Sequence, residues 1–245
     1  MPIPTLRNQR VVVIGGTSGI GFAVARSALA EGADVIVGSS SAARVTDAVK
    51  RLGGTASGAA VDVRDEASVA EFFKPIGSFD HLAYTAGDWG PNRGGGTVAQ
   101  MDLAGANPTF RVRFWGALIA IRHAQPHLCT RGSITLTNGM IAHRPRKEAA
   151  LSSAMAGAIE HLTRALAVDL APLRVNAVCP GYVLTEVWDS IPADRREAQL
   201  QRMTARQPLA RAGDPDEVAQ AYLYLMRGGF TTGQVLVVDG GMALV

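Results

Sequence analysis

The sequence has few of the residues that build disulfide frameworks and metal clusters. Cys129 and Cys179 are the only cysteines among 245 residues, too few and too far apart for either, so we expect no metal. No apolar run reaches the ~18 residues that a membrane span needs. Residues 1–10 have neither the apolar core of a secretory signal nor the amphipathic Arg/Ser pattern of a transit peptide. These absences predict a reduced, cytoplasmic protein with no membrane segment.

Lysine is also scarce, and the basic charge is not concentrated anywhere. Only Lys50, Lys74 and Lys147 are lysines among the 24 basic residues, and the formal net charge is +3. The arginines are scattered and form no long basic run, whereas a protein that follows a phosphate backbone concentrates them. We therefore predict no nucleic-acid partner.

The bulk composition and the apolar pattern predict one ordered α/β domain. Hydrophobic residues make up 47% of the chain and charged residues 18%, which argues against disorder. Short apolar runs alternate with segments of helical spacing, as in βαβ units, and no linker or repeat divides residues 1–245. The fold class is therefore predicted to be α/β, a doubly wound parallel sheet of about seven strands with helices on both faces. The predicted strands are 11–14, 34–37, 59–61, 81–84, 133–136, 174–178 and 235–238, and the clearest helices are 22–31, 42–52, 109–128 and one from about 152.

A glycine-rich loop, GGTSGIG at residues 15–21, separates the first predicted strand from the first predicted helix. Its glycines let the backbone turn sharply and approach a pyrophosphate, and the helix N-terminus supplies free N–H groups. Such a motif alone also fits a merely tight turn. Its place between a strand and a helix favours a Rossmann-like dinucleotide site. The residues assigned to this site are Gly15, Thr17, Ser18, Gly19, Ile20 and Gly21.

The end of the second predicted strand favours NADP(H) over NAD(H). An acidic residue there would hold the ribose 2′-hydroxyl of NAD. Instead the chain has Ser39, Ser40 and Ser41, followed by Arg44 one helical turn on. Hydroxyl groups and a guanidinium accommodate a 2′-phosphate better than a carboxylate does. A serine after a strand is also an ordinary helix N-cap, and that alternative stays open.

At this point the chain resembles the short-chain dehydrogenase/reductases of about 250 residues. The resemblance rests on the glycine loop, on Asp62-Val63 after the third strand, and on TAG at 85–87, where the family has N-A-G. It continues through HLTRALAVDLAPLRVNAVCPGYVLT at 161–185, PLARAGDPDEVA at 208–219 and TTGQVLVVDGG at 231–241. It implies hydride transfer between a nicotinamide cofactor and a carbonyl or alcohol. The further cofactor contacts it implies are Asp62, Val63, Ala86, Gly87, Pro180, Gly181, Val183 and Thr185.

The same resemblance locates four catalytic positions, and all four depart from the family pattern. The family uses an Asn, Ser, Tyr, Lys tetrad. Here Arg113 stands at the asparagine position, Gly139 at the serine, Ser152 at the tyrosine and Ala156 at the lysine. No Y-x-x-x-K string exists anywhere in the chain. A serine hydroxyl is too weak an acid to replace a tuned phenol, so ordinary carbonyl reduction is doubtful.

Other polar groups near the predicted site are candidates to take over. Tyr84 ends the fourth strand, Asn138 adjoins Gly139, and His143 lies in the following loop, where an imidazole suits acid–base work. A core aromatic, an ordinary loop side chain and an exposed histidine are the competing interpretations. Arg113 with Arg144 and Arg146 would suit an anionic ligand, or would simply be solvated. By resemblance, residues 186–211 include the substrate lid.

Three functional hypotheses follow. The first is an NADP(H)-binding protein of oxidoreductase ancestry that has lost the family mechanism. The second is an atypical oxidoreductase, or a nonredox lyase or isomerase, that uses other pocket groups on a small-molecule substrate. The third is a sensor or scaffold subunit. The resemblance also implies a homodimer or homotetramer formed through the helices at 109–128 and 152–171 and the last strand.

Overall fold

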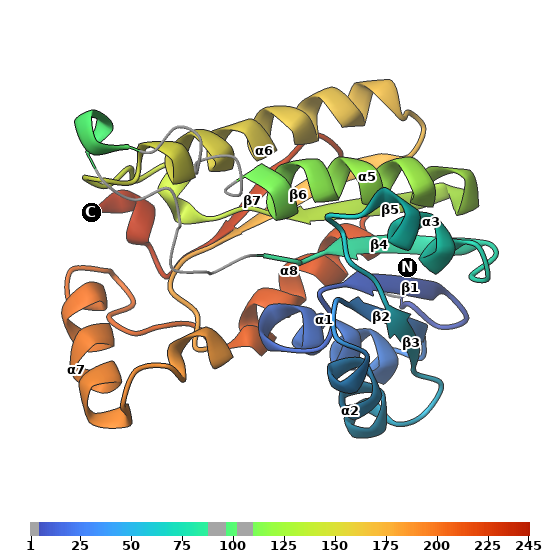
Figure 1. The fold of residues 1–245 in the computed structure, drawn as a ribbon, viewed down its shortest axis with the longest axis horizontal. Helices are drawn as coiled ribbons and strands as arrows, with labels where there is room; N and C mark the ends of the chain where they lie inside the picture. Colours follow the sequence, from blue (N-terminus) through green and yellow to red (C-terminus); the bar gives the residue numbers. More distant parts are fainter. Residues whose placement is uncertain (1–4, 88–96, 102–109) are drawn as a thin grey trace.

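The computed structural model of the protein describes residues 5–87, 97–101 and 110–245 (Figure 1). It contains one seven-stranded parallel sheet in the order β3-β2-β1-β4-β5-β6-β7. The predicted fold class is confirmed. The strands are β1 (Arg10–Ile14), β2 (Asp34–Ser39), β3 (Ser57–Ala60), β4 (Phe79–Tyr84), β5 (Leu128–Thr137), β6 (Arg174–Pro180) and β7 (Val235–Val238).

Two helical layers cover the sheet, one on each face (Figure 1). In β1, Val11 and Val13 point into one core and Val12 into the other, because successive side chains of a strand alternate between faces. Both faces are buried, which explains the unbroken VVVI run. The helices are α1 (Gly19–Ala30), α2 (Ala42–Leu52), α3 (Glu66–Phe73), α5 (Gly116–Ala124), α6 (Ala150–Asp169), α7 (Ala193–Thr204) and α8 (Pro215–Arg227).

The helix predicted at 109–128 is shorter and less regular than expected. Residue 109 lies outside the described residues, a π-helical turn η2 occupies Arg111–Trp115, and α5 ends at Ala124. Pro126 lies in the short 3₁₀ turn η3 (Gln125–His127), and β5 then begins at Leu128. Proline cannot donate the hydrogen bond that would continue an α-helix. The prediction that the helix reaches residue 128 was therefore wrong.

The order of the strands creates the place for a ligand. The chain moves outward in one direction from β1 to β2 and β3, and in the other from β4 onward. The C-terminal ends of β1 and β4 are therefore neighbours whose following loops diverge. In open α/β sheets this divergence is where ligands bind.

Candidate functional site

The glycine loop is packed so tightly that Gly15 and Gly21 leave no room for a side chain at their positions. Gly15 has φ +89°, and a Cβ there would lie 2.6 Å from the backbone N of Ala86. A Cβ on Gly21 would lie 2.3 Å from both the Gly15 carbonyl oxygen and Thr85 Oγ1. Thr85, which stands where the family has asparagine, donates from its backbone N to the Ile14 carbonyl at 2.8 Å. The structure thus brings the predicted residues after β1 and β4 together in one cradle.

The start of α1 fits the pyrophosphate of a dinucleotide. Ser18 is the N-cap residue but makes no side-chain capping bond, and the first turn contains no acidic residue. No side chain of the loop or of the first turn therefore caps the helix, and its N-terminus can attract an anion. The predicted residues Ile20 and Gly21 lie in this turn, and Thr17, which is buried, lies in the loop just before it.

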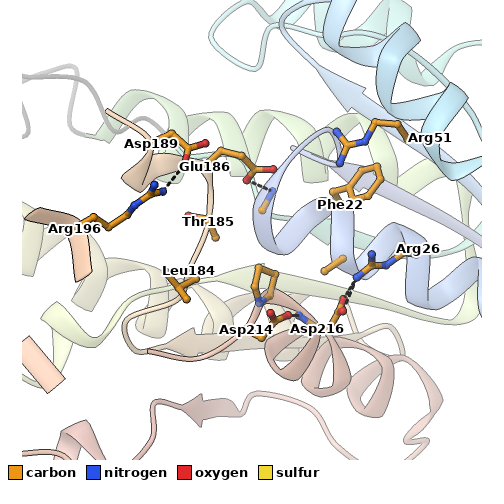
Figure 2. Close-up of a pocket in the computed structure, with 13 residues that line it drawn as sticks. Phe22, Arg26, Arg51, Leu184, Thr185, Glu186, Asp189, Arg196, Asp214 and Asp216 are labelled. Carbon is orange, nitrogen blue, oxygen red and sulfur yellow. Dashed lines mark hydrogen bonds and ion pairs between the residues drawn. The ribbon is translucent and has the colours of Figure 1, made fainter. Parts of the chain in front are cut away.

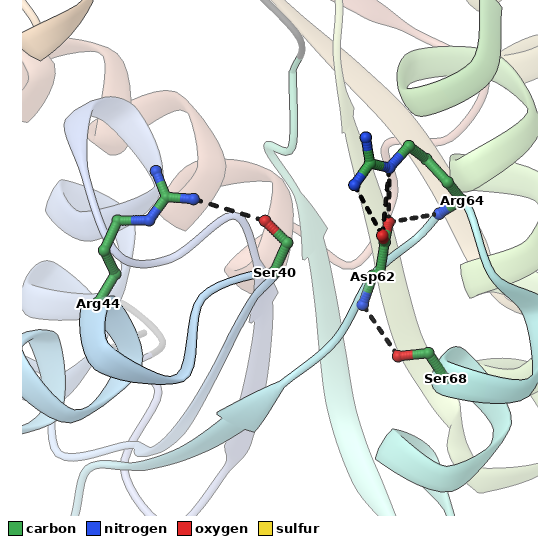
Figure 3. Close-up of polar contacts among 5 residues, drawn as sticks. All are labelled: Ser40, Arg44, Asp62, Arg64 and Ser68. Atoms are coloured by element: carbon green, nitrogen blue, oxygen red, sulfur yellow. Dashed lines mark hydrogen bonds and ion pairs between the residues drawn. The ribbon is translucent and has the colours of Figure 1, made fainter.

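The serines at and after the end of β2 have different partners, so helix capping and cofactor binding can fall to different residues. The backbone N of Arg44 donates to Ser41 Oγ at 3.3 Å, so Ser41 is the N-cap of α2. Ser40 is left to accept from the Arg44 guanidinium at 3.4 Å (Figure 3). Ser39 is the last residue of β2. A hydroxyl and an exposed guanidinium therefore meet where a 2′-phosphate is expected.

Asp62 is held by a partner that the sequence analysis missed. The Arg64 guanidinium binds the Asp62 carboxylate in a bidentate pair, with distances of 2.9 and 2.8 Å, and this pair keeps the Asp62 pKa below its ordinary value (Figure 3). The backbone N of Asp62 donates to Ser68 Oγ at 3.0 Å, while Val63 is buried. The signal was present in the sequence as an arginine two residues after the aspartate.

The segment after β6 packs against the glycine loop. Pro180 ends β6, and a Cβ on Gly181 would lie 2.8 Å from Asp239 Cα. Val183 is buried. Thr185 reaches α1, since its Cγ2 would be 3.1 Å from a Cβ on Gly19. Residues far apart in the sequence, Gly19 and Thr185, thus lie side by side. Of the other predicted contacts, Ala86 is half-buried and Gly87 exposed after β4.

The four predicted catalytic positions lie in η2, in the loop before the 3₁₀ turn at Met140–Ala142, and in α6, and they offer unequal chemistry. Arg113 is half-buried in the π turn η2, Ser152 is half-buried in the first turn of α6, and Ala156 is buried one turn further. A Cβ on Gly139 would meet nothing within 4 Å. The site therefore has space at the serine position but no side chain in it. π turns inside helices are frequent at functional sites.

Comparison with known proteins identifies the family. A family profile described as "Enoyl-(Acyl carrier protein) reductase" matches residues 15–243. The short-chain dehydrogenase/reductase ATR9 of Stachybotrys chlorohalonatus is 34% identical over 99% of this chain and 100% of its own length. This chain belongs to the short-chain dehydrogenase/reductase family.

Solved structures of the family agree with this fold. A small-chain dehydrogenase in complex with NADPH has a TM-score of 0.83 and 37% identity, with 97% of this chain and 100% of that chain covered. The MalC reductase/Diels-Alderase from Malbranchea aurantiaca has a TM-score of 0.90 and 32% identity, with 98% of both chains covered. Within the described residues, no helix combines the length and apolar character needed to cross a membrane.

Tyr84 does not have the surroundings of a catalytic acid in this family member. Its side chain is 2% exposed, and its hydroxyl donates to the Val112 carbonyl. Burial raises its pKa far above the ordinary value. A phenol that holds its proton so firmly and faces a helix backbone is a core residue. The structure thus favours the core-aromatic interpretation.

Asn138 and His143 converge on a half-buried acid, Glu160 of α6. Asn138 Nδ2 donates to Glu160 Oε1 at 3.0 Å, and His143 Nε2 lies 2.7 Å from the same oxygen. The Glu160 side chain is 13% exposed and that of His143 is 38% exposed. Asn138 is therefore directed at a carboxylate rather than at an open pocket. His143 is oriented by an acid and still reaches solvent, as an acid–base imidazole requires.

Cys179 lies beside His143 and Glu160, although it is 36 and 19 residues away from them in sequence. The donor atoms of His143, Glu160 and Cys179 lie within 4.8 Å of one another, and Cys179 Sγ is 3.6 Å from Met140 Sδ. Burial raises the Cys179 pKa to about 12, so the thiol is protonated at neutral pH. Glu160 accepts from Asn138 and pairs with His143. The absence of a metal remains a prediction.

A cleft of about 530 Å³ lies beside the glycine loop. It is lined by α1, the segment after β6 and the start of α8 (Figure 2). Its charged side chains are largely paired: Arg26 with Asp216, and Arg196 with Asp189 at 2.6 Å. Glu186 and Gly19 both line this cleft, and Glu186 Oε2 accepts a hydrogen bond from the Gly19 backbone N at 2.8 Å. The sequence had placed Glu186 only at the start of the lid.

Proposed function

We propose that this chain is an NADP(H)-binding short-chain dehydrogenase/reductase that does not use the family's tetrad mechanism. The observation that carries the proposal is a contrast within one site. The glycine cradle tolerates no side chain, whereas the predicted catalytic positions hold Arg113, Gly139, Ser152 and a buried Ala156. General acid–base help is worth ~10²–10⁴-fold and an oxyanion donor ~10²–10³-fold. Ordinary carbonyl reduction is therefore expected to be slow.

The preference for NADP(H) is supported by the Ser40–Arg44 pair and by the absence of an acidic residue from 38–44. The relative in complex with NADPH, which covers 97% of this chain, agrees with it. The arginines around the mouth, Arg113 in η2 and the exposed Arg144 and Arg146, favour an anionic small-molecule ligand.

Two measurements test this proposal. NADPH is titrated against the protein, and failure to bind at millimolar concentration would overturn it. NADPH oxidation is then screened over ketones, quinones and acidic carbonyl compounds, with the native chain beside Gly139→Ser/Ser152→Tyr/Ala156→Lys. Turnover that appears only in the triple variant, once its Tm shows that it folds, is the expected result. Native turnover that the triple variant does not exceed would contradict it.

A second candidate is an atypical catalyst that uses His143. It is favoured by the Asn138–Glu160–His143 chain, and a relative with the same fold, MalC, is called a reductase/Diels-Alderase. If the screen finds turnover, His143→Gln should lower it and shift its pH profile, while His127→Gln should not. Unchanged rates in His143→Gln would end this candidate. Cofactor binding without any turnover would favour a sensor or scaffold.

We also infer a homodimer or homotetramer. Val168 on α6 is 80% exposed and Val237 on β7 is 39% exposed, which places apolar side chains on the elements through which the assembly is predicted. Light scattering coupled to gel filtration should give two or four chains per particle. A single chain at micromolar concentration would contradict this. A cytoplasmic location stays a prediction.

A further inference from the structure

The carboxylate of Glu186 lies where the cofactor's pyrophosphate is expected. Gly19 is the first residue of α1, and its N–H donates to Glu186 Oε2 at 2.8 Å (Figure 2). Neither Ser18 nor any acidic residue of the first turn caps this helix. An acid 167 residues away in the chain therefore supplies the anion that the N-terminus of α1 attracts.

The side chain of the preceding residue, as well as that of Glu186, packs against the start of α1. The preceding residue, Thr185, would have its Cγ2 3.1 Å and its Cβ 3.2 Å from a Cβ on Gly19, and Glu186 Oε2 would be 3.5 Å away. Glu186 also begins the 3₁₀ turn η5 (Glu186–Trp188), in which Trp188 Nε1 donates to the Val183 carbonyl at 2.9 Å. A hydrogen-bonded turn thus positions the carboxylate of Glu186 against the glycine loop.

We propose that Glu186 acts as a competing anion that lowers the affinity of this site for a dinucleotide. A carboxylate and a pyrophosphate carry charge of the same sign, and both draw on the free N–H groups and positive end of one helix. Cofactor binding then has to displace Glu186 from Gly19 or accept the repulsion between the two anions. This inference rests on the proposed binding of NADP(H).

The chain offers variants that separate charge from shape. Glu186→Gln keeps an oxygen that can accept from the Gly19 N–H but removes the negative charge. Glu197→Gln removes an equal charge from α7, where the carboxylate accepts from Gln201 Nε2 at 2.8 Å. Glu186→Ala removes the cap itself.

The test is a titration of wild type and each variant with NADPH. Binding is measured by calorimetry and by the change in NADPH fluorescence. Glu186→Gln should lower the Kd about 2- to 5-fold, the range expected for one charge at a helix N-terminus, and Glu197→Gln should leave it unchanged. Adenosine 2′-monophosphate, which has no pyrophosphate, should bind wild type and Glu186→Gln equally. An equal or higher Kd for NADPH in Glu186→Gln would overturn the proposal.

A purely structural role for Glu186 gives a different pattern. Glu186→Ala should lower the Tm by about 1–4 °C, because a helix cap is lost, and yet tighten NADPH binding. If Glu186 only held the loop in shape, both Tm and affinity would fall together. If neither wild type nor Glu186→Gln binds NADPH at millimolar concentration, the proposed function fails rather than the role of Glu186.

Discussion

Gly15 and Gly139 differ in what they contribute to the site, although each lies in a loop that follows a strand of the same sheet. Gly15 has φ +89° and is surrounded by backbone, whereas Gly139 has an extended backbone, with φ −165° and ψ 150°, and space around it. The first glycine is required by conformation and close approach. The second is required by neither, so the backbone and the space around it would accept a side chain.

This difference predicts opposite results for two alanine substitutions. Gly15→Ala should lower the free energy of unfolding by more than about 2 kcal/mol, because it combines a strained φ with a contact of 2.6 Å to backbone. Gly139→Ala should change it by less than about 0.5 kcal/mol. Urea unfolding of both variants measures this. A Gly139→Ala protein as unstable as Gly15→Ala would show that the space at Gly139 is wrongly described.

Arg44 is expected to decide between the two nicotinamide cofactors. Arg44→Ala should weaken NADPH binding about 3- to 10-fold, since an exposed charge-assisted contact to the 2′-phosphate is lost. It should leave NADH binding unchanged. Lys50→Ala removes the same charge from the same exposed helix, away from Ser40, and is the matched control. Equal weakening of NADPH and NADH would place Arg44 outside the 2′-phosphate site.

At the scale of elements, α8 shows a helix whose start is strongly specified by its sequence. Asp214 and Glu217 form a capping box, and Pro215 occupies the first helical position. Glu217 also pairs with Arg211 at 2.7 Å. This pair and the backbone N–H of Asp214 lower the Glu217 pKa to about 2. The arrangement fastens α8 to the end of the lid segment.

The lowered pKa of Glu217 predicts how this element responds to acid. A carboxyl whose folded pKa lies below its unfolded value stabilises the protein above the unfolded pKa, and this contribution is lost as pH falls toward 2. Wild type should therefore have a higher Tm than Glu217→Gln from pH 7 down to about pH 5, and the gap should close on further acidification. A gap that stays constant to pH 2.5 would show that the charge of Glu217 is not its cause.

The sequence predicted elements well where local signals agreed and poorly where contacts were distant. The helix at 42–52 and the strand at 235–238 have the predicted bounds, because a cap and an apolar run mark their ends. The short helix α3 was missed, and its N-cap, Asp65, follows the unrecognised Arg64 closely. The contacts Glu186–Gly19 and Glu160–His143 span 167 and 17 residues. No spacing rule connects such pairs, since tertiary packing alone brings them together.

At the scale of the whole molecule, the buried His81 forms hydrogen bonds that link three segments at the centre of the sheet. His81 of β4 is 3% exposed, with Nδ1 2.8 Å from Ser133 Oγ of β5 and Nε2 2.7 Å from Gln9 Oε1 before β1. These bonds satisfy a neutral imidazole, with Nε2 donating and Nδ1 accepting. Burial lowers the His81 pKa to about 4, and the nearby Asp80 offsets only part of this effect.

The His81 pKa predicts an acid-sensitive fold. Because the folded pKa of about 4 lies below the unfolded value of 6.5, the unfolded chain takes up the proton first as pH falls. The stabilisation is complete above pH 6.5 and is lost between pH 6.5 and about 4. Urea unfolding should therefore show a loss on the order of 2 kcal/mol between pH 7.5 and pH 5. His81→Gln should flatten this dependence, and His127→Gln should not.

If His81→Gln does not fold, the histidine signals in the NMR spectrum of the wild-type protein test the prediction instead. A His81 resonance that titrates near pH 6.5 would contradict it.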